Sequence, residues 1–429
     1  MKYSSIDNNL FLSNRANFSK QLKTNSIAIF QANDEFPRSG DQTHIFKQNA
    51  DLFHLSGIDQ EQTILVLFPD CPNPLYEEVL FLRQTSEQIA VWEGHKYTIE
   101  EARKASGIKS IFWLDEFWNI LPTIIHYANT IYLNTNENDR YAHQVTYRDL
   151  RFISDMKQRY PLHQYERSAL IMRDLRPVKS KIEIDLTQKA CNITKDALVR
   201  VLKFVKPGVN EYEIEAEIIH EFIRQGATGH AYNPIIASGP NANILHYTAN
   251  NQICKNGDVI LFDFGAEYGN YNADLSRSVP VSGKFTPRQK DVYNAVLRVM
   301  NEAKKMIIAG TIWNEYHEEV GKIMESELIG LGLLDKHDVA KQDPAMPLYK
   351  KYFMHGTSHH LGLDVHDFAS RYKPFEAGNI LTCEPGIYIQ REGLGMRLEN
   401  NILITSDGNI DLMADTPIEL DEIEEIMNS

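Results

Sequence analysis

The chain has 429 residues, of which 43% are hydrophobic and 24% are charged, a composition typical of a globular protein long enough for two buried cores. Its formal net charge of -14 disfavours binding to nucleic acid or to an anionic membrane, since both need clustered Lys and Arg. The sequence also lacks a long apolar membrane span and the basic and apolar blocks of a secretory signal.

The first part of the chain mixes short apolar runs with helical stretches, which predicts an α/β domain. The apolar runs cover residues 26–30, 63–68 and 77–82. A proline and several charges within residues 175–185 precede a long amphipathic segment, and we place the domain boundary there. The predicted domains are therefore residues 1–177 and residues 178–429.

Two pairs of helices are predicted in the second domain. Residues 181–205 carry apolar side chains at helical spacing, and a second helix with capping-box chemistry runs from Asn210 to Gly226. A third helix is expected over residues 286–308, and Asn314 is expected to open a fourth.

Each helix pair precedes strand-rich sequence, and each strand-rich region contributes two carboxylates. Asp263 and Asp274 follow the first pair, and Glu384 and Glu399 follow the second. This order indicates an internal duplication with a site at its pseudo-twofold junction. A chance similarity between helix starts is the alternative interpretation.

The first carboxylate pair lies in a predicted hairpin. If its turn is centred between Tyr268 and Gly269, Asp263 and Asp274 are directly opposite one another; a shift of one residue makes them diagonal neighbours on the same face. Both registers allow the two side chains to share one ion. An aspartate inside an apolar strand is costly unless a cation, a proton or hydrogen bonds compensate it. Either residue alone also fits a turn or an edge.

The second pair lies in the segments LTCEPGIYI and MRLEN. Pro385-Gly386 breaks the strand directly after Glu384 and fixes the direction of that side chain. Arg397 and Glu399 are two residues apart, so they share a face, where an exposed ion pair is the alternative to a functional site. Cys383 is expected to point away from Glu384 as a buried thiol.

Four histidines, at positions 355, 359, 360 and 366, lie in HGTSHHLGLDVHD, which lacks the glutamate of the zinc-protease HExxH helix. One histidine among four carboxylates favours hard divalent ions such as manganese or cobalt. Four carboxylates neutralise two such ions, and a hydroxide held between them would be a nucleophile near neutral pH. The four cysteines have no Cys-x-x-Cys spacing, so we expect reduced thiols in a cytoplasmic protein.

These motifs resemble those of the pita-bread peptidases, and within them the aminopeptidase P family, over nearly the whole chain. The resemblance rests on residues 38–58, on the junction at residues 178–194, on ILHYTAN at residues 244–250, and on the histidine and glutamate motifs above. It implies an α+β protein whose C-terminal domain has the pita-bread (creatinase/aminopeptidase) fold with a pseudo-twofold duplication. An α/β creatinase-type N-terminal domain would precede it.

The resemblance also implies roles for individual residues. The metal ligands would be Asp263, Asp274, His359, Glu384 and Glu399, with Glu384 also acting as general base. His246 and His366 would hydrogen-bond the substrate around the scissile carbonyl. The pocket for proline and the residue beyond it would include His355, Tyr388 and Arg397, and Asp41 would help to frame the site.

The implied activity is a metal-dependent hydrolysis that releases the N-terminal residue from peptides with proline at the second position. Two divalent ions are expected, Mn²⁺ first, with Co²⁺ or Zn²⁺ as alternatives. Xaa-Pro dipeptidase (prolidase) activity is the near alternative, and a non-catalytic peptide-binding module is a distant one, since such modules lack the ligands. We expect no nucleic-acid or membrane partner. We expect the protein to assemble as a homodimer or homotetramer.

Three positions depart from the family pattern. Asn400 and Asn401 stand where the family usually has two aspartates, and His360 stands where a bulky aromatic residue is common. The segment after His366 is short and leaves Arg371 as the counterpart of a substrate-contacting arginine. None of these changes alters a predicted metal ligand, so we expect them to affect specificity more than activity.

Overall fold

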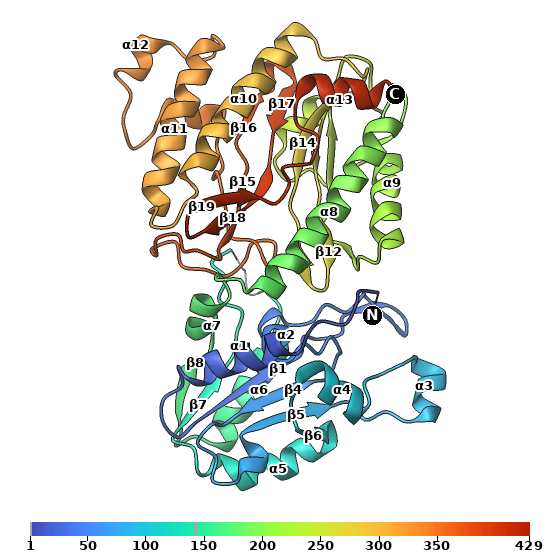
Figure 1. Cartoon of the computed structure of the whole chain (residues 1–429), viewed down its shortest axis with the longest axis vertical. Coiled ribbons are helices and arrows are strands. Elements are labelled where there is room, and N and C mark those ends of the chain that lie inside the picture. Colours follow the sequence, from blue (N-terminus) through green and yellow to red (C-terminus); the bar gives the residue numbers. More distant parts are fainter. Residues whose placement is uncertain (1, 141–143) are drawn as a thin grey trace. The chain divides into compact units, whose positions relative to one another are not determined.

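The computed structural model describes residues 2–140 and 144–429 (Figure 1). The chain divides between Arg176 and Pro177 into two compact units, and each is described by itself. The N-terminal unit spans Ser5–Arg176, and the C-terminal unit spans Pro177–Ser429 together with the tail up to Ser4. Within the described residues, no helix is both long and apolar enough to cross a membrane.

The N-terminal unit contains a six-stranded sheet with the strand order β6-β5-β4-β1-β7-β8. All neighbouring strands are parallel except at β4, which is antiparallel to both β1 and β5. The apolar runs of the sequence form its centre, as expected. The strands are β1 (Ser26–Gln31), β4 (Ile64–Leu67), β5 (Glu78–Leu82), β6 (Ser110–Trp113), β7 (Thr130–Leu133) and β8 (Gln164–Arg167), and a separate hairpin pairs β2 (Pro37–Ser39) with β3 (Gln42–Thr43).

Helices cover both faces of this sheet, because alternate strand residues are apolar on both sides. Ala28 and Phe30 of β1 pack with α1, α2, α4 and α7, whereas Ile27 and Ile29 pack with α5 and α6. The predicted α/β layering is confirmed. The helices are α1 (Asn9–Ser19), α2 (Ala50–Ser56), α3 (Glu87–Glu93), α4 (Ile99–Ser106), α5 (Phe117–Ile125), α6 (Arg148–Arg159) and α7 (Ala169–Leu175).

The C-terminal unit repeats one order of elements, two helices followed by strands. The first half has α8 (Lys181–Phe204), α9 (Glu211–Arg224), β9 (Gly229–His230), β10 (Ile235–Ser238), β11 (Val259–Asp263), β12 (Ala266–Tyr268), β13 (Tyr271–Asn272) and β14 (Ser276–Pro280). The second has α10 (Pro287–Met306), α11 (Trp313–Gly330), α12 (Lys336–Val339), β15 (Ile380–Cys383), β16 (Gly386–Ile389), β17 (Leu394–Arg397), β18 (Asn400–Thr405), β19 (Gly408–Asp411) and the final α13 (Leu420–Met427). The expected duplicated pita-bread architecture is confirmed.

The helix predictions are correct to within a residue or two, with one instructive difference at α11. Asn210 precedes α9, and its N–H donates to the Glu213 carboxylate at 2.7 Å, as a capping box requires. Asn314, in contrast, lies inside α11, which already begins at Trp313. The Trp313 ring, in the first turn of the helix, packs edge-on against Phe375 with 5.5 Å between ring centroids.

The hairpin of the first half adopts the second of the two predicted registers. Asp263 pairs with Ser276, and Tyr268 pairs with Tyr271, so the turn is centred between Gly269 and Asn270. Asp274 is therefore a diagonal neighbour of Asp263, not its direct partner. The strands approach closely at Gly265, where an added Cβ would lie 1.7 Å from the carbonyl oxygen of Ala273.

The two halves meet where β14 runs beside the β17–β18 connection. Glu399 N–H donates to the Ser276 carbonyl at 3.1 Å, and Arg397 N–H donates to Ser278 Oγ at 3.1 Å. The buried Arg277 guanidinium adds a bond of 2.8 Å to the Glu399 carbonyl. This junction brings the carboxylates of the two halves together.

Candidate metal centre

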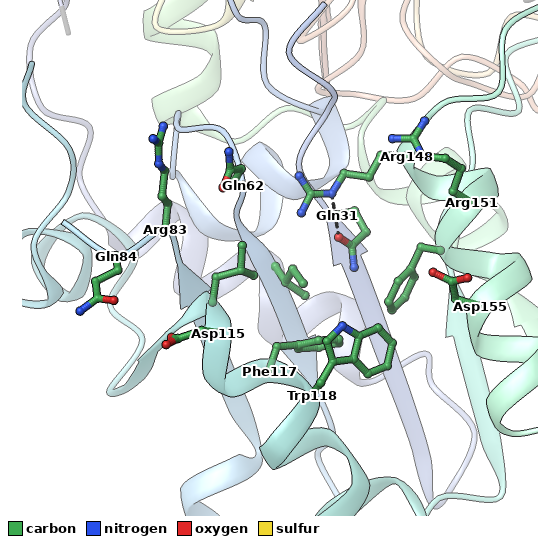
Figure 2. A pocket seen from close by; sticks show the side chains of 13 residues that line it. Gln31, Gln62, Arg83, Gln84, Asp115, Phe117, Trp118, Arg148, Arg151 and Asp155 are labelled. Carbon is green, nitrogen blue, oxygen red and sulfur yellow. Dashed lines mark hydrogen bonds between the residues drawn. The ribbon is translucent and has the colours of Figure 1, made fainter. Parts of the chain in front are cut away.

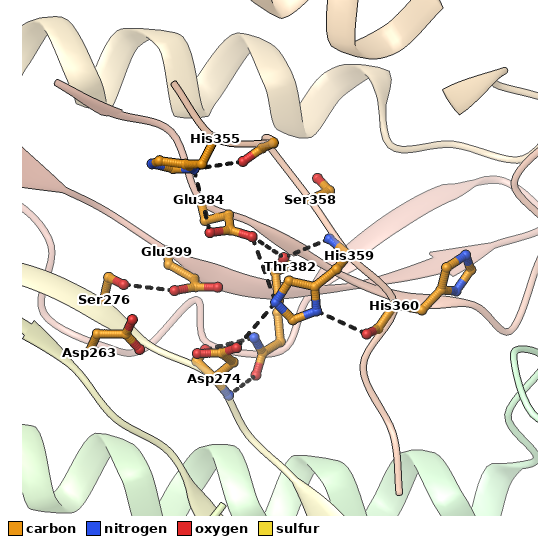
Figure 3. A network of polar contacts seen from close by, with 12 residues as sticks. Asp263, Asp274, Ser276, His355, Ser358, His359, His360, Thr382, Glu384 and Glu399 are labelled. Carbon is orange, nitrogen blue, oxygen red and sulfur yellow. Dashed lines mark hydrogen bonds and ion pairs between the residues drawn. The ribbon is translucent and has the colours of Figure 1, made fainter. Parts of the chain in front are cut away.

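The five predicted ligands come from five separate segments and meet at the junction of the two halves (Figure 3). Each lies at the end of a strand or in a loop next to one, where the backbone is free to turn a side chain toward a common point. They are Asp263 at the end of β11, Asp274 between β13 and β14, His359 before β15, Glu384 between β15 and β16, and Glu399 between β17 and β18.

Three of the five side chains form a compact buried group. One candidate ligand atom from each of Asp274, His359 and Glu399 lies within 4.8 Å of the other two. The Nε2 atom of His359 is 3.3 Å from Asp274 and 3.6 Å from Glu384. Glu384 therefore joins the group beside the histidine.

Asp263 is connected to the group by a residue that the sequence did not reveal. The hydroxyl of Tyr232 lies 2.6 Å from Asp263 and also contacts Asp274. Tyr232 comes from the segment between β9 and β10, and no local pattern marks it. Ser276 and Thr382 were also overlooked, although each lies two residues from a predicted ligand, a spacing that places strand side chains on the same face.

The imidazole of His359 is oriented by its neighbour in the chain. Its Nδ1 lies 2.9 Å from the carbonyl oxygen of His360, which can only accept, so Nδ1 carries the hydrogen. The lone pair of the neutral ring is then on Nε2, which faces the carboxylates. Burial opposes a charge on His359, but Asp274 and Glu384 outweigh it and raise the pKa of the ring. A ring held in this way is suited to bind a cation through Nε2.

The carboxylates carry more negative charge than the protein groups around them compensate. Burial raises the pKa of Glu384 to about 7, although His359 and Arg397 oppose the shift. Burial, reinforced by Asp274 and other neighbouring carboxylates, raises the pKa of Glu399 well above its ordinary value. Among the described residues, Glu399 Oε1 has no hydrogen-bond partner, whereas Oε2 accepts from Ser276 at 2.7 Å. A buried acceptor without a donor, amid excess negative charge, fits a divalent cation.

A chain of hydrogen bonds connects the predicted pocket residues to Asp263. Arg397 donates to the Asp263 carboxylate at 2.5 Å and to the Tyr388 hydroxyl at 2.8 Å. The Nδ1 of His355 donates to the Gly356 carbonyl, so its Nε2, 2.8 Å from the Tyr388 hydroxyl, accepts from it. Burial and the Arg397 charge lower the pKa of His355 to about 3, consistent with a neutral ring.

The remaining predicted residues lie at different distances from the centre. The His366 ring packs edge-on against His359, with 4.4 Å between ring centroids. His246 is exposed, and it is close enough to His355 to affect its charge. Arg371 is exposed, and Asp41 is exposed between β2 and β3 of the N-terminal unit.

The two asparagines that depart from the family pattern have separate contacts. Asn401 makes two bonds to the backbone of Asp274: its Nδ2 donates to the carbonyl at 2.7 Å, and its Oδ1 accepts from the N–H at 3.1 Å. Asn400 accepts from Arg277 at 2.8 Å and donates to Asp411. Asn401 therefore positions a predicted ligand, whereas Asn400 connects two charged groups behind it.

We expect Asn401→Leu to lower the affinity for metal about 10–100-fold, because the Asp274 backbone loses both of its side-chain partners. The free energy of unfolding should also fall by about 2 kcal/mol, since a buried N–H and carbonyl are left unpaired. Metal titration and chemical denaturation measure the two effects. Asn409 provides the matched control, because it also donates to two backbone carbonyls, of Lys304 and Ile307, but away from the centre. Asn409→Leu should cost stability and leave metal affinity unchanged; equal losses of affinity would contradict the assignment.

His360 is buried in a place that suits an apolar ring. It stacks on Trp313 with 5.8 Å between centroids, and its Nδ1 has no hydrogen-bond partner among the described residues. Burial, with a smaller effect of Lys179, lowers the pKa of His360 to about 3. The unfolded chain therefore binds a proton between about pH 6.5 and 3 that the folded chain does not, so this residue destabilises the fold as the pH falls.

When the pH falls from 7 to 5, His360 should lower the free energy of unfolding of the parent protein by about 2 kcal/mol. We expect this loss to be absent in the His360→Phe protein. Denaturant unfolding at the two pH values measures the difference. His220→Gln, on the exposed side of α9, should leave the pH dependence as it is. The prediction is wrong if the His360→Phe protein loses as much stability on acidification as the parent.

Comparisons with known proteins agree with this geometry. Residues 185–406, more than half of the chain, match metallopeptidase family M24, and residues 11–132 match the aminopeptidase P N-terminal domain. The chain is 35% identical to the Xaa-Pro aminopeptidase of Escherichia coli over 99% of this chain and 98% of that protein. It is 32% identical to the Xaa-Pro aminopeptidase of Haemophilus influenzae, over 95% and 94% of the two chains.

Solved structures show the same relationship. Aminopeptidase P from E. coli with the inhibitor Pro-Leu has a TM-score of 0.88 and 31% identity, and the match covers 99% of both chains. Aminopeptidase PepP from Pseudomonas aeruginosa has a TM-score of 0.88 and 30% identity over 99% of this chain and 98% of that chain. With its buried carboxylate and histidine centre, the chain belongs to metallopeptidase family M24 and is a metal-dependent peptidase that carries the aminopeptidase P N-terminal domain.

Proposed function

We propose that this protein is an Xaa-Pro aminopeptidase, which hydrolyses the bond between the first residue of a peptide and a proline at the second position. One observation carries the proposal: Asp274, His359 and Glu399 form a buried group next to Glu384 and Asp263, and Glu399 Oε1 lacks a hydrogen-bond donor among the described residues. The full-length relationship to Xaa-Pro aminopeptidases supports the choice of substrate.

Two divalent ions are the proposed cofactors. Asp263 and Asp274 would bind one, His359 and Glu384 would bind the other with Asp274 near both, and Glu399 would bridge the pair. When bound, such ions lower the pKa of a water molecule and stabilise negative charge on a carbonyl oxygen. Mn²⁺ is proposed first, because oxygen ligands outnumber nitrogen ligands, with Co²⁺ and Zn²⁺ as alternatives.

Glu384 is the proposed general base. Its carboxylate accepts from Thr382 Oγ1 at 3.3 Å, which leaves Oε2 available on the side of His355, 3.8 Å away. A carboxylate beside the attacking water can accept the proton of that water. Glu384 would take the proton of the attacking water and deliver it to the proline nitrogen as that nitrogen leaves.

The neighbouring histidines are proposed to hold the substrate. His246 and His366 would donate hydrogen bonds around the scissile carbonyl, while His355, Tyr388 and Arg397 would shape the pocket for proline and the residue beyond. A dedicated pocket suits this bond, because proline has no N–H and a fixed φ, so it cannot bind as an ordinary extended strand.

Three further properties are part of the proposal. The functional domains would be residues 1–177 and 178–429, and the enzyme would assemble as a homodimer or homotetramer. A cytoplasmic location is supported by the four cysteines, which are all buried and free of disulfides. Sedimentation of the purified protein would measure the assembly.

The test is a chelation and restoration experiment with two substrates. Removal of metal should abolish cleavage of an Xaa-Pro tripeptide, and Mn²⁺ should restore it. A tripeptide in which alanine replaces proline should remain uncut. Cleavage confined to an Xaa-Pro dipeptide would make the protein a prolidase, and no cleavage with Mn²⁺, Co²⁺ or Zn²⁺ would leave only the peptide-binding interpretation.

A further inference from the structure

A cavity of about 580 Å³ lies in the N-terminal unit, apart from the carboxylate centre (Figure 2). Its walls come from the carboxyl ends of β1, β5 and β6, the amino end of β4, and the helices α5 and α6. Because β4 is antiparallel to β1 and β5, its amino end lies at the same sheet edge as their carboxyl ends. Cavities of about 300–1,000 Å³ are the usual size of small-molecule sites.

Two side chains place unused hydrogen-bond donors at the cavity. Arg148 Nε donates to Gln31 Oε1 at 3.1 Å, which fixes the orientation of the Gln31 amide. Gln31 is 3% exposed, and its Nε2 has no hydrogen-bond partner among the described residues. Both residues line the cavity, and the Nη atoms of the Arg148 guanidinium are its remaining side-chain donors there.

Some of the charged side chains that line the cavity have ion-pair partners among the described residues, and others do not. Arg83 pairs with Glu61 and Glu93, and Arg151 pairs with Asp34. Arg148 has no carboxylate oxygen within 4 Å of its guanidinium in the described part of the chain, although Asp34 and Asp149 act on it at longer range. Asp115 and Asp155 also line the wall. Arg148 is therefore the cation whose planar donor pair is available to a ligand.

The opposite end of the cavity is apolar. Figure 2 shows Phe117 and Trp118 on the far side of Gln31 from Arg148. The Phe152 ring contacts both, with 6.0 Å and 6.1 Å between ring centroids. The Trp118 ring is 37% exposed, with the Arg159 guanidinium over it at 4.3 Å from the ring centroid, and the buried Phe117 supports it edge-on with 4.9 Å between ring centroids. A flat apolar body fits such a wall, since aromatic faces stack on planar groups.

We propose that this cavity binds a small organic carboxylate with a flat apolar body. The carboxylate would form a bidentate pair with the two Nη atoms of Arg148, whose orientation the Gln31 amide fixes, and the body would lie against the exposed ring of Trp118. A planar carboxylate matches the planar fork of an arginine better than other anions do.

The experiment measures the binding of benzoate, phenylacetate and indole-3-acetate to the full-length protein by calorimetry, with and without bound metal. At least one should bind saturably and equally in both states, since the cavity is independent of the metal centre. Benzamide, which has the same shape without the charge, should bind at least tenfold more weakly than benzoate.

The variant Gln31→Glu separates this site from others. Gln31→Glu places a carboxylate against Arg148, which occupies its donors while the side-chain shape is kept, so affinity should fall at least tenfold. Arg103→Gln, in an exposed ion pair on α4, should leave affinity unchanged. The proposal is overturned if none of the three carboxylates binds the metal-free protein, if only inorganic phosphate binds, or if Gln31→Glu binds them as tightly as the parent.

Discussion

Glu384→Gln should lower kcat for an Xaa-Pro tripeptide about 10²–10⁴-fold, with a much smaller change in KM, because a general base contributes that range to catalysis. Glutamine keeps the shape of the side chain and an acceptor for Thr382 Oγ1, the bond that now measures 3.3 Å. It cannot take a proton from water. Steady-state kinetics at saturating Mn²⁺ measures the effect, and metal analysis of the same sample shows whether both ions remain bound.

Glu392→Gln is the control for this change. Glu392 lies between β16 and β17, where its carboxylate forms an ion pair with Arg288 at 2.8 Å. The same chemical substitution there should leave kcat within a factor of two or so, because partly exposed ion pairs are worth little. A Glu384→Gln enzyme within tenfold of the parent, with its metal retained, would show that another group accepts the proton.

The five candidate ligands could be picked out from the sequence because each has a local sequence signal. Asp263 interrupts an apolar strand, Glu384 precedes a Pro-Gly break, and Glu399 follows Arg397 at the spacing of one strand face. Such signals depend only on neighbours in the chain. The resemblance to a known family then supplied what local patterns do not contain, namely which distant segments meet.

The parts that escaped prediction depend on tertiary packing. Tyr232 reaches Asp263 and Asp274 from a loop whose course is set by the sheets around it, and the sequence around it carries no polar pattern. The sequence of the hairpin allows two turn centres, and only the pairing of Asp263 with Ser276 and of Tyr268 with Tyr271 distinguishes them. Likewise, Asn314 has the chemistry of a helix cap, but α11 already begins at Trp313, whose ring packs against Phe375.

Glu399→Gln should abolish metal-dependent stabilisation together with activity. A ligand at about 1,000 times its Kd stabilises a folded protein by about 4 kcal/mol, and loss of the proposed bridging carboxylate removes most of that gain. Thermal unfolding with and without Mn²⁺ measures the difference directly, independently of peptide cleavage.

In the metal-free protein, the same Glu399→Gln substitution should not lower the stability. The pKa of Glu399 is raised by burial and neighbouring carboxylates, so its ionisation costs folding free energy, and this cost appears as the pH rises through the raised pKa. Glutamine carries no such charge. The metal-free variant should therefore be at least as stable as the metal-free parent at pH 8, and the gap should close toward pH 5.

Glu211 is the control for the stability of Glu399→Gln with and without metal. It is also a fully buried glutamate of the same unit, but its carboxylate accepts four hydrogen bonds, from the N–H and hydroxyl of Ser238, the Tyr247 hydroxyl and the Gln252 N–H. Glu399 accepts one, from Ser276. Glu211→Gln should destabilise the protein with and without metal and leave the Mn²⁺-dependent gain intact, because its donors, not an ion, compensate that charge. If both variants lose stability equally in the metal-free state, Glu399 is a structural carboxylate and the bridging role is wrong.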